Sequence, residues 1–388
     1  MNSRERFLNS LLGGPVDRFF RYEHGCWPST RERWLLEGYP AEAGCYHDDP
    51  GFRAFFQMDP LVRIKINSGY TDSPYQPKFE RRALEESREH LLYVDEDGIT
   101  KRVLRRNEDT SMPQFVRFPV AGREDWRRVR ARLNPDDAPA RIGDRAALLQ
   151  QCSDPEVATL LPICGAFGHP RNLLGDEGLS FVLYDDPALL HEILENWYEL
   201  YVKLIRALTA LVRVDAVLIW EDMCYKGGPL ISPAHVRAFM LPYYKRFIRE
   251  ARDCGVQGII VDTDGNLLSL IPLFLEAGVN ALMPFEVQAG MDVVRIRREF
   301  GPSFCIIGGI DKRALAQGQA AIEAEVTRVV PYFLQSGRYI PTLDHTVPTD
   351  VSLANFQYYL CVLRSYERFF DVARDDSIIA PYKKHLVR

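Results

Sequence analysis

Apolar residues along this chain gather in short runs that end abruptly in polar residues. The clearest run, residues 256–261, is followed at once by Asp262, Thr263 and Asp264. A run this apolar and β-branched is typical of a strand buried on both faces, as strands of parallel sheets are. Asp262 and Asp264 stand two residues apart, so their side chains project to the same side of an extended chain. Because two such carboxylates repel each other, the pattern indicates a metal ion or a substrate cation between them.

Similar apolar runs recur along the chain and alternate with amphipathic stretches, which predicts parallel strands joined by right-handed helical crossovers. No GxGxxG stands between a predicted strand and a helix, so a closed barrel is favoured over a doubly wound sheet. We therefore predict an α/β fold, a (β/α)8 TIM barrel. Its eight strands are expected at residues 16–25, 62–66, 157–163, 216–220, 256–261, 279–283, 304–307 and 339–343. Helices are expected at residues 2–12, 29–37, 186–212, 232–253, 267–277, 292–300, 312–335 and 352–370, with Ser29 or Thr30 and Ser232 as caps.

The N-terminal third departs from this rhythm over residues 45–137. Residues 91–94 and 99–103 read as two strands, and Asp97-Gly98 between them suits the positive φ angles of a hairpin turn. We predict that this region holds one barrel strand and an antiparallel insertion, which acts as a lid, a dimer arm or both. No Pro/Gly/Ser-rich linker divides the chain, so residues 1–388 are expected to form a single domain.

Composition narrows the classes of function. The chain has 388 residues, 46% of them hydrophobic, and a formal net charge of -5, so it can bury a sizeable core but lacks the basic surface that nucleic acids and membranes require. Its eight cysteines are scattered without a CxxC spacing, and its N-terminal residues are charged and amphipathic, unlike a signal peptide. We therefore expect reduced thiols and a cytoplasmic location.

Polar residues follow the predicted strands, and in a barrel these positions face one another across the mouth. Carboxylates follow nearly every strand of the second half, where their repulsion requires cations or raised pKa values. The strand-end residues are Glu23, His24, Asn67, Phe167, His169, Arg171, Glu221, Asp222, Asp262, Asp264, Glu286, Asp311, Lys312, Asp344 and His345.

Some of these residues also have structural explanations. Asp264 is placed to cap the next helix, whereas Asp262 lies too early to do so, which favours a functional role for it. Asp344 and His345 suit a hydrogen-bonded pair that holds a loop. They suit equally well a general base or metal ligand oriented by a neighbouring acid.

Four strand-end residues together supply an oxygen-rich set with one imidazole: Glu221, Asp262, Asp264 and His345. That mixture suits zinc, manganese, iron or magnesium better than a thiolate-seeking ion. A divalent metal site is therefore predicted at the mouth, built from residues that are distant in sequence.

Several motifs in order resemble the uroporphyrinogen decarboxylase superfamily, whose members share a TIM barrel. They are ERF at residues 5–7, PVDR at 15–18, GGPLISP at 227–233, PYYK at 242–245 and DHTVP at 344–348, with Asn355. The resemblance covers most of the chain. It implies a TIM barrel and a shared pocket, and it is less specific to any one reaction.

The N-terminal segment departs from true uroporphyrinogen decarboxylases, in which an RQAGR-type segment supplies arginines for the substrate carboxylates. Here residues 22–27 read YEHGCW, which does not suit a polycarboxylate porphyrinogen. The superfamily's acidic segment after the fourth strand is similar to residues 220–223, and its C-terminal histidine matches His345. The resemblance thus indicates a divergent member.

Corrinoid-linked methyltransferases form the other large branch, and they hold zinc with a His-x-Cys pair after the fifth strand and a Cys after the eighth. Asp262, Asp264 and His345 fall at those positions, so the resemblance implies a divalent metal, zinc first, with changed ligand chemistry. Oxygen ligands favour a harder ion and an ether, alcohol or carboxylate substrate. No DxHxxG motif occurs, so a corrinoid is expected only on a partner protein.

The leading hypothesis is a metal-dependent enzyme of this superfamily, most like the methyltransferase branch and acting on a small molecule. A metal-free decarboxylase of a tetrapyrrole or other carboxylated substrate is the alternative, and a non-catalytic binding barrel is a third. A homodimer is also considered, with residues 196–211 as a candidate interface or ordinary core. The predicted catalytic residues are Glu221, Asp222, Asp344 and His345, with Asp344 orienting His345; the metal ligands are Asp262, Asp264, His345 and Glu221; the substrate-binding residues are His24, His169, Arg171, Glu286 and Asp311.

Overall fold

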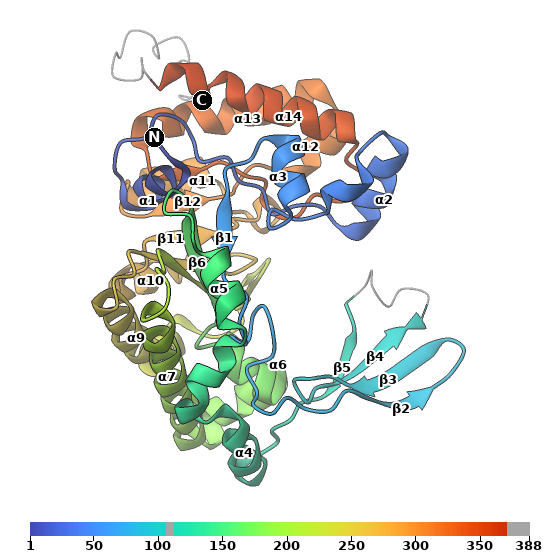
Figure 1. Ribbon diagram of the computed structural model, residues 1–388, viewed down its shortest axis with the longest axis vertical. Helices are drawn as coiled ribbons and strands as arrows, with labels where there is room; N and C mark the ends of the chain where they lie inside the picture. The colour runs from blue at the N-terminus through green and yellow to red at the C-terminus, as the bar shows by residue number, and fades with distance from the viewer. Residues whose placement is uncertain (106–111, 371–388) are drawn as a thin grey trace.

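Seven parallel strands form one curved sheet at the centre of this computed structural model, which describes residues 1–105 and 112–370 (Figure 1). Residues 106–111 of the predicted insertion and residues 371–388 lie outside the described part. The strands pair in chain order, so each crossover returns beside the strand before it. They are β1 (Leu61–Arg63), β6 (Ala158–Cys164), β7 (Ala216–Trp220), β10 (Gly258–Asp262), β11 (Ala281–Met283), β12 (Cys305–Ile307) and β13 (Tyr339–Ile340).

Both faces of this sheet are buried, which explains the nearly continuous apolar runs in the sequence. On β7, Val217 and Ile219 pack outward against the helices, whereas Ala216 and Leu218 belong to a separate cluster inside the curve. All seven residues of β6 are buried in the same way. This alternation places every second residue of each strand toward the interior of the curve.

Helices follow most of these strands, as predicted, and cover the outer face of the sheet (Figure 1). Ser232 caps its helix as expected, but α2 begins one residue earlier than predicted and its N-cap residue is Trp27. The helices are α1 (Ser3–Leu12), α2 (Pro28–Leu36), α3 (Pro50–Phe56), α4 (Arg123–Arg130), α5 (Arg145–Gln151), α6 (Gly168–Asp185), α7 (Pro187–Thr209), α8 (Pro233–His235), α9 (Leu241–Asp253), α10 (Ile271–Ala277), α11 (Val293–Phe300), α12 (Lys312–Gln317), α13 (Gln319–Ser336) and α14 (Leu353–Ser365). Of the helices in the described ranges, none is long and apolar enough to cross a membrane.

One of the eight predicted strands, the first in the chain, is wrong: residues 16–25 form no ladder with either neighbouring strand. The segment is extended, and Phe20 and Tyr22 pack into the inner cluster as strand residues would. Its backbone touches the sheet's two edges only at points, where Asp59 N–H donates to Arg21 C=O and Cys26 forms a single bridge with Val347. The predicted (β/α)8 barrel is therefore seen as seven paired strands and one unpaired extended segment.

Helix α1 packs against the end of the curve where the strands begin, and it supplies Phe7, Leu8 and Leu11 to the inner cluster. Gly258 at the start of β10 makes room for it, because a Cβ there would lie 2.8 Å from Leu11 Cδ1. The strand starts are thus filled with apolar side chains, and chemistry is left to the strand ends.

The predicted hairpin is confirmed and belongs to a four-stranded antiparallel sheet that projects away from the parallel one (Figure 1). Its turn contains Gly98 at a φ of 76°, as the sequence predicts. Its strands are β2 (Arg82–Glu86), β3 (His90–Val94), β4 (Thr100–Leu104) and β5 (Gln114–Arg117). A separate two-stranded sheet, β8 (Cys224–Tyr225) and β9 (Gly228–Pro229), follows β7 in the chain.

The helical face proposed as a dimer interface lies inside this chain. Along α7, Trp197, Leu200, Leu204 and Leu208 have no exposed surface and join the large cluster between sheet and helices. This face is therefore ordinary core, the second of the two interpretations that the sequence allowed.

Candidate active site

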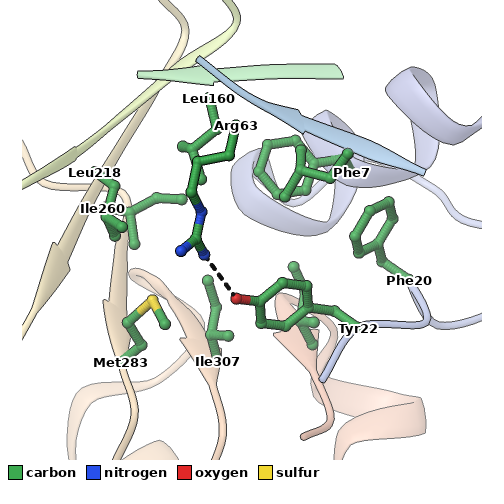
Figure 2. A pocket seen from close by; sticks show the side chains of 11 residues that line it. Phe7, Phe20, Tyr22, Arg63, Leu160, Leu218, Ile260, Met283 and Ile307 are labelled. Atoms are coloured by element: carbon green, nitrogen blue, oxygen red, sulfur yellow. Dashed lines mark hydrogen bonds between the residues drawn. The ribbon is translucent and has the colours of Figure 1, made fainter. Parts of the chain in front are cut away.

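Arg63 and Tyr22 separate the apolar interior from the strand ends. Figure 2 shows the Arg63 guanidinium reaching inward over Leu218, Ile260 and their neighbours, with Nη2 donating to the Tyr22 hydroxyl at 3.1 Å. These two are the polar residues among the eleven that line this small cavity. A cation held over an apolar cavity forms the floor of the mouth.

Asp262 stands at the end of β10, two residues beyond Ile260, so it points to the same inner side one step nearer the mouth. No described residue donates a hydrogen bond to its carboxyl group, although the charges of Arg63 and Asp264 act on it. Burial, together with the Asp264 and Asp222 carboxylates, raises the pKa of Asp262 to about 8. Near neutral pH, Asp262 is therefore protonated, and no described residue donates a hydrogen bond to it.

Asp264 and His345 form a pair at the mouth, with His345 Nε2 3.5 Å from Asp264 Oδ2. Burial disfavours ionisation of Asp264, but the contact with His345 outweighs it and holds the pKa of Asp264 below its ordinary value. The same contact raises the pKa of His345. Trp27 stacks on the imidazole with ring centroids 6.2 Å apart. Asp264 is thus the ionised acid beside the protonated Asp262.

Asp222 lies across the mouth beside Arg171. Its backbone has a φ of 48°, a conformation that residues other than glycine rarely adopt, and its C=O accepts a 2.6 Å hydrogen bond from Arg171. Burial and the Asp264 carboxylate raise the pKa of Asp222. The Arg171 guanidinium lies over the Trp220 ring, 5.0 Å from its centroid, and 3.9 Å from the nearer Asp222 carboxylate oxygen. It is a cation without a bidentate partner among the described residues.

Asp344 does not orient His345, which corrects the prediction from their adjacency. Its buried carboxylate accepts hydrogen bonds from the backbone N–H groups of Val287 and Lys312, at 2.9 and 3.1 Å. Lys312 Nζ lies 3.5 Å from it. The partner of His345 is Asp264 instead, because that side chain lies in the mouth while Asp344 points toward the neighbouring loops.

Glu286 lies at the rim, where its Oε2 accepts a hydrogen bond from Gly265 N–H at 3.0 Å and its Oε1 is 3.9 Å from Lys312 Nζ. It therefore holds the loop that carries Asp264. Asp311 caps α12 and also pairs with Arg313, so its carboxylate is engaged away from the mouth.

Glu221 is fully buried and faces the start of α6, away from the mouth. Its carboxylate accepts hydrogen bonds of 2.8 Å from three successive backbone N–H groups, residues 166–168, and another from the Tyr244 hydroxyl. Burial raises the pKa of Glu221 to about 7, against the lowering effect of those N–H groups. Both carboxylate oxygens of Glu221 thus accept hydrogen bonds, mainly from a helix N-terminus, where anions are commonly bound. This geometry does not support the prediction of Glu221 as metal ligand and base.

His24 is half-buried and His169 is buried, and each has a ring Nε2 without a hydrogen-bond partner among the described residues. Burial lowers the pKa of His169 to about 4. Burial and the charges of His345 and Arg63 lower the pKa of His24 to about 3. Both imidazoles are therefore neutral near pH 7.

The predicted metal ligands do not fit a ready-made metal site. Within the described ranges, no group of three or more His, Cys, Asp or Glu side chains is arranged to hold a metal ion. Asp264 and His345 are in contact, but the Glu221 carboxylate is bound by backbone N–H groups at the start of α6.

Arg63 is the main site residue that sequence reasoning missed. It ends a strand of three residues inside the least regular part of the chain. The prediction instead rested on the carboxylates that follow the later strands. A signal was present, because Leu61 and Arg63 stand two apart and must point to the same side.

These features define an α/β protein with a curved parallel sheet of seven strands and with ionisable groups collected at the carboxyl ends of those strands. Comparison with known proteins then identifies the family. Residues 106–366 match the family model described as uroporphyrinogen decarboxylase (URO-D), and the chain belongs to this family, which confirms the resemblance seen in the sequence.

Two relatives are uroporphyrinogen decarboxylases. One, from Methylococcus capsulatus, is 26% identical over 215 residues, covering 54% of this chain and 57% of that protein. Another, from Nocardia farcinica, is 30% identical over 225 residues, covering 55% and 58%. The chain thus spans a little over half the length of these curated relatives.

A solved structure with the same fold is a methyltransferase from Methanosarcina mazei. It has a TM-score of 0.61 at 13% identity and covers 94% of this chain and 99% of its own. The family model establishes the family. Because the relatives include decarboxylases and the fold neighbour is a methyltransferase, these comparisons do not distinguish between the two reactions.

Proposed function

We propose that this chain is a decarboxylase-type enzyme that transfers a proton to the carbon of a small carboxylated substrate, with Asp262 as the proton donor. The observation that carries the proposal is the position of Asp262. Its carboxyl group lies at the inner side of the mouth, free of hydrogen bonds from described residues and next to Arg63. A structural carboxyl group would be hydrogen-bonded.

Divergent acidities of neighbouring carboxyl groups support the same role. The pKa of Asp262 is raised to about 8, whereas that of Asp264 is lowered by His345. Two close acids with separated pKa values are the usual arrangement of a proton donor beside a permanently ionised group. His345 has a raised pKa and a partly exposed side chain, so it can return a proton from solvent to Asp262.

The chemistry follows from these positions. A substrate carboxylate leaves as CO2, its bonding electrons stay on carbon, and that carbon takes the proton of Asp262. Arg171 lies at the mouth without a bidentate partner, so it is the candidate to hold a substrate carboxylate.

The test is to incubate the protein with a panel of small carboxylic acids in D2O and to follow the mixtures by NMR. We expect loss of CO2 with one deuteron on the product carbon, and a rate about 10² to 10⁴ times lower in Asp262→Asn. Asp253→Asn, an exposed aspartate on α9, is the matched control. Undiminished turnover in Asp262→Asn contradicts the proposal.

Methyl transfer is the second candidate, favoured by the fold shared with the methyltransferase over nearly the whole chain. In that case Asp262, Asp264 and His345 would hold a divalent metal ion, and a corrinoid would come on a partner protein. Elemental mass spectrometry of protein purified without chelators tests it. One equivalent of a single metal, lost in the Asp264→Ala, His345→Ala double variant, supports methyl transfer; equal metal content in both proteins contradicts it.

A further inference from the structure

Cys26 and Cys45 face each other across two short segments of the chain that pair as antiparallel strands do. Gly25 and Tyr46 form an antiparallel bridge, and in the next pair the backbone N–H of Cys26 donates to the C=O of Cys45 at 2.8 Å. Residues directly opposite each other in such a pair have Cα atoms about 4.5–5.5 Å apart and side chains on the same face. The two thiols are close enough that each shifts the pKa of the other.

Glycine at position 25 makes this close approach possible, because a Cβ there would lie 2.3 Å from the carbonyl oxygen of Cys45. The Asp49 carboxylate holds the opposite segment, where it accepts hydrogen bonds from the N–H groups of Cys45 and Tyr46 at 2.8 and 2.9 Å. The Cα atoms of a disulfide are usually about 4.4–6.8 Å apart. The backbone therefore already holds Cys26 and Cys45 at a separation that a disulfide can span.

The two thiols differ in accessibility and in acidity. Cys26 has no exposed surface, whereas Cys45 is half-buried. Burial raises the pKa of both thiols, but the Arg31 guanidinium and the Cys26 thiol lower that of Cys45, while a charge on Cys45 opposes ionisation of Cys26. Cys45 is therefore the thiol that a small oxidant reaches and the one that ionises first.

Arg31, on α2, gives a second and independent indication that a negative charge forms here. Its Nε is buried without a hydrogen-bond partner among the described residues, although one of its Nη atoms donates to the C=O of Ala41. Buried donors without an acceptor are rare in folded proteins, and a neighbouring cation favours the thiolate form of a cysteine. The unused N–H and the charge of Arg31 thus suit a thiolate at Cys45, which is the reactive form.

We infer that Cys26 and Cys45 are a reversible oxidation site, which hydrogen peroxide converts into a disulfide. The Cys45 thiolate attacks a peroxide oxygen; an S–O bond forms, the O–O bond breaks, and hydroxide leaves and takes up the Cys45 proton as water. The Cys26 sulfur then attacks the sulfur of the sulfenic acid at Cys45. The S–S bond forms, the S–O bond breaks, and hydroxide takes up the Cys26 proton as a second water. Two thiols are thus oxidised and one peroxide molecule is reduced.

The disulfide fixes the extended segment that borders the mouth. Trp27, the neighbour of Cys26, stacks on His345, and its backbone N–H donates to the C=O of Val347 at 3.2 Å. A covalent link from Cys26 to Cys45 ties this segment to a second part of the chain. The inference goes beyond the proposed function and does not depend on it, since the oxidation needs no turnover at the mouth.

To test the site, the purified full chain is treated with hydrogen peroxide, its remaining thiols are blocked with N-ethylmaleimide, and it is digested with trypsin without reductant. Mass spectrometry should find the peptides of residues 22–31 and 34–53 joined by a disulfide, and dithiothreitol should separate them. Recovery of both peptides unlinked, or a link from Cys45 to any other cysteine, overturns the inference. This readout uses the wild-type protein, so it does not depend on how a variant folds.

Variants and a second measurement sharpen the result. Cys26→Ala should lose the linked peptide and carry Cys45 to sulfinic or sulfonic acid, because no thiol captures the sulfenic acid. Cys361→Ala, at an exposed cysteine on α14, is the matched control and should keep the link. Hydrogen exchange over residues 22–27 should be slower in the oxidised than in the reduced wild-type protein. An unchanged exchange rate, or a link between two chains on a non-reducing gel, contradicts the inference.

Discussion

Glu221 shows how a single residue can serve the fold at a position where chemistry was expected. Its carboxylate fits only because residue 165 is glycine: a Cβ at Gly165 would lie 2.0 Å from one carboxylate oxygen. The strand-end rule placed Glu221 correctly on the chain, but it could not tell that the loop after the neighbouring strand β6, residues 165–168, encloses its carboxylate.

Replacing Gly165 by Ala should therefore lower the free energy of unfolding by about 1–3 kcal/mol, since the new methyl group forces Glu221 off its N–H donors. Urea denaturation followed by circular dichroism measures the change. Gly122→Ala is the matched control, because a Cβ there meets no atom within 4 Å. Equal losses in the two variants would show that the Glu221 contact is not the cause.

At the same scale, sequence reasoning found Asp262, Asp264 and His345 but assigned the wrong partner to His345. Adjacency in sequence suggested Asp344, yet successive residues after a strand point in different directions. The true partner, Asp264, comes from another strand end, and such pairs depend on how the loops turn. Arg63 was missed because its strand has only three residues, too few for periodicity to define.

Among the elements, seven of eight strands were predicted, and the failure of the eighth has a physical reason. Phe20 and Tyr22 face inward in alternation, as in a strand, so the hydrophobic pattern of an extended segment and of a paired strand is the same. Pairing also requires neighbours of matching length, and β13 and β1 have only two and three residues. Side-chain contacts hold this segment in place of a ladder.

Asp59 supplies much of that attachment. Its carboxylate, 5% exposed as a residue, accepts hydrogen bonds from Arg6, from Arg18 and from the backbone N–H of Arg21. Asp59→Asn should lower the free energy of unfolding by about 1.5–3 kcal/mol, because Arg18 loses its carboxylate partner while Arg6 keeps only Asp17. Hydrogen exchange should increase most over residues 19–26, and Asp176→Asn, at an exposed helical site, should change neither. Uniform exchange in Asp59→Asn would contradict this account of the segment.

For the whole molecule, the sequence predicted an insertion and one hairpin, but not how far the resulting sheet stands from the core. All residues of β2 and β5 are exposed, and the sheet projects away from the parallel sheet in Figure 1. Local patterns define hairpins, whereas the placement of a sheet depends on contacts distant in sequence. Its role as lid or dimer arm stays a prediction.

Buried titratable groups should control the stability of the whole molecule as pH changes. The pKa values of Glu23, Glu221 and Asp262 are raised to about 7, 7 and 8, so the folded state keeps protons that the unfolded state loses above about pH 4.5. The pKa values of His24, His47 and His169 are lowered to about 3, 3 and 4. Below about pH 6.5 these histidines are therefore protonated in the unfolded state but stay neutral in the folded state.

These two sets oppose each other below pH 6.5, since stability falls with rising pH for the carboxyl groups and rises for the histidines. Above pH 6.5 the histidines are neutral in both states and contribute no further change. The three carboxyl groups and His345, whose pKa is raised, titrate in the folded state in this range, and the loss of their protons lowers stability as pH rises.

We therefore expect stability to change little between pH 5 and 6.5 and to fall by about 2 kcal/mol between pH 6.5 and 8.5. Urea denaturation at pH 5.5, 6.5 and 8.5 measures it. Glu23→Gln isolates one contribution: Glu23 is 1% exposed and bonded to Thr342 and Tyr359, so its loss should flatten the upper part of the curve. A stability that rises from pH 6.5 to 8.5 would mean that these carboxyl groups are ionised in the folded protein, and Asp262 would then be unable to donate a proton near neutral pH.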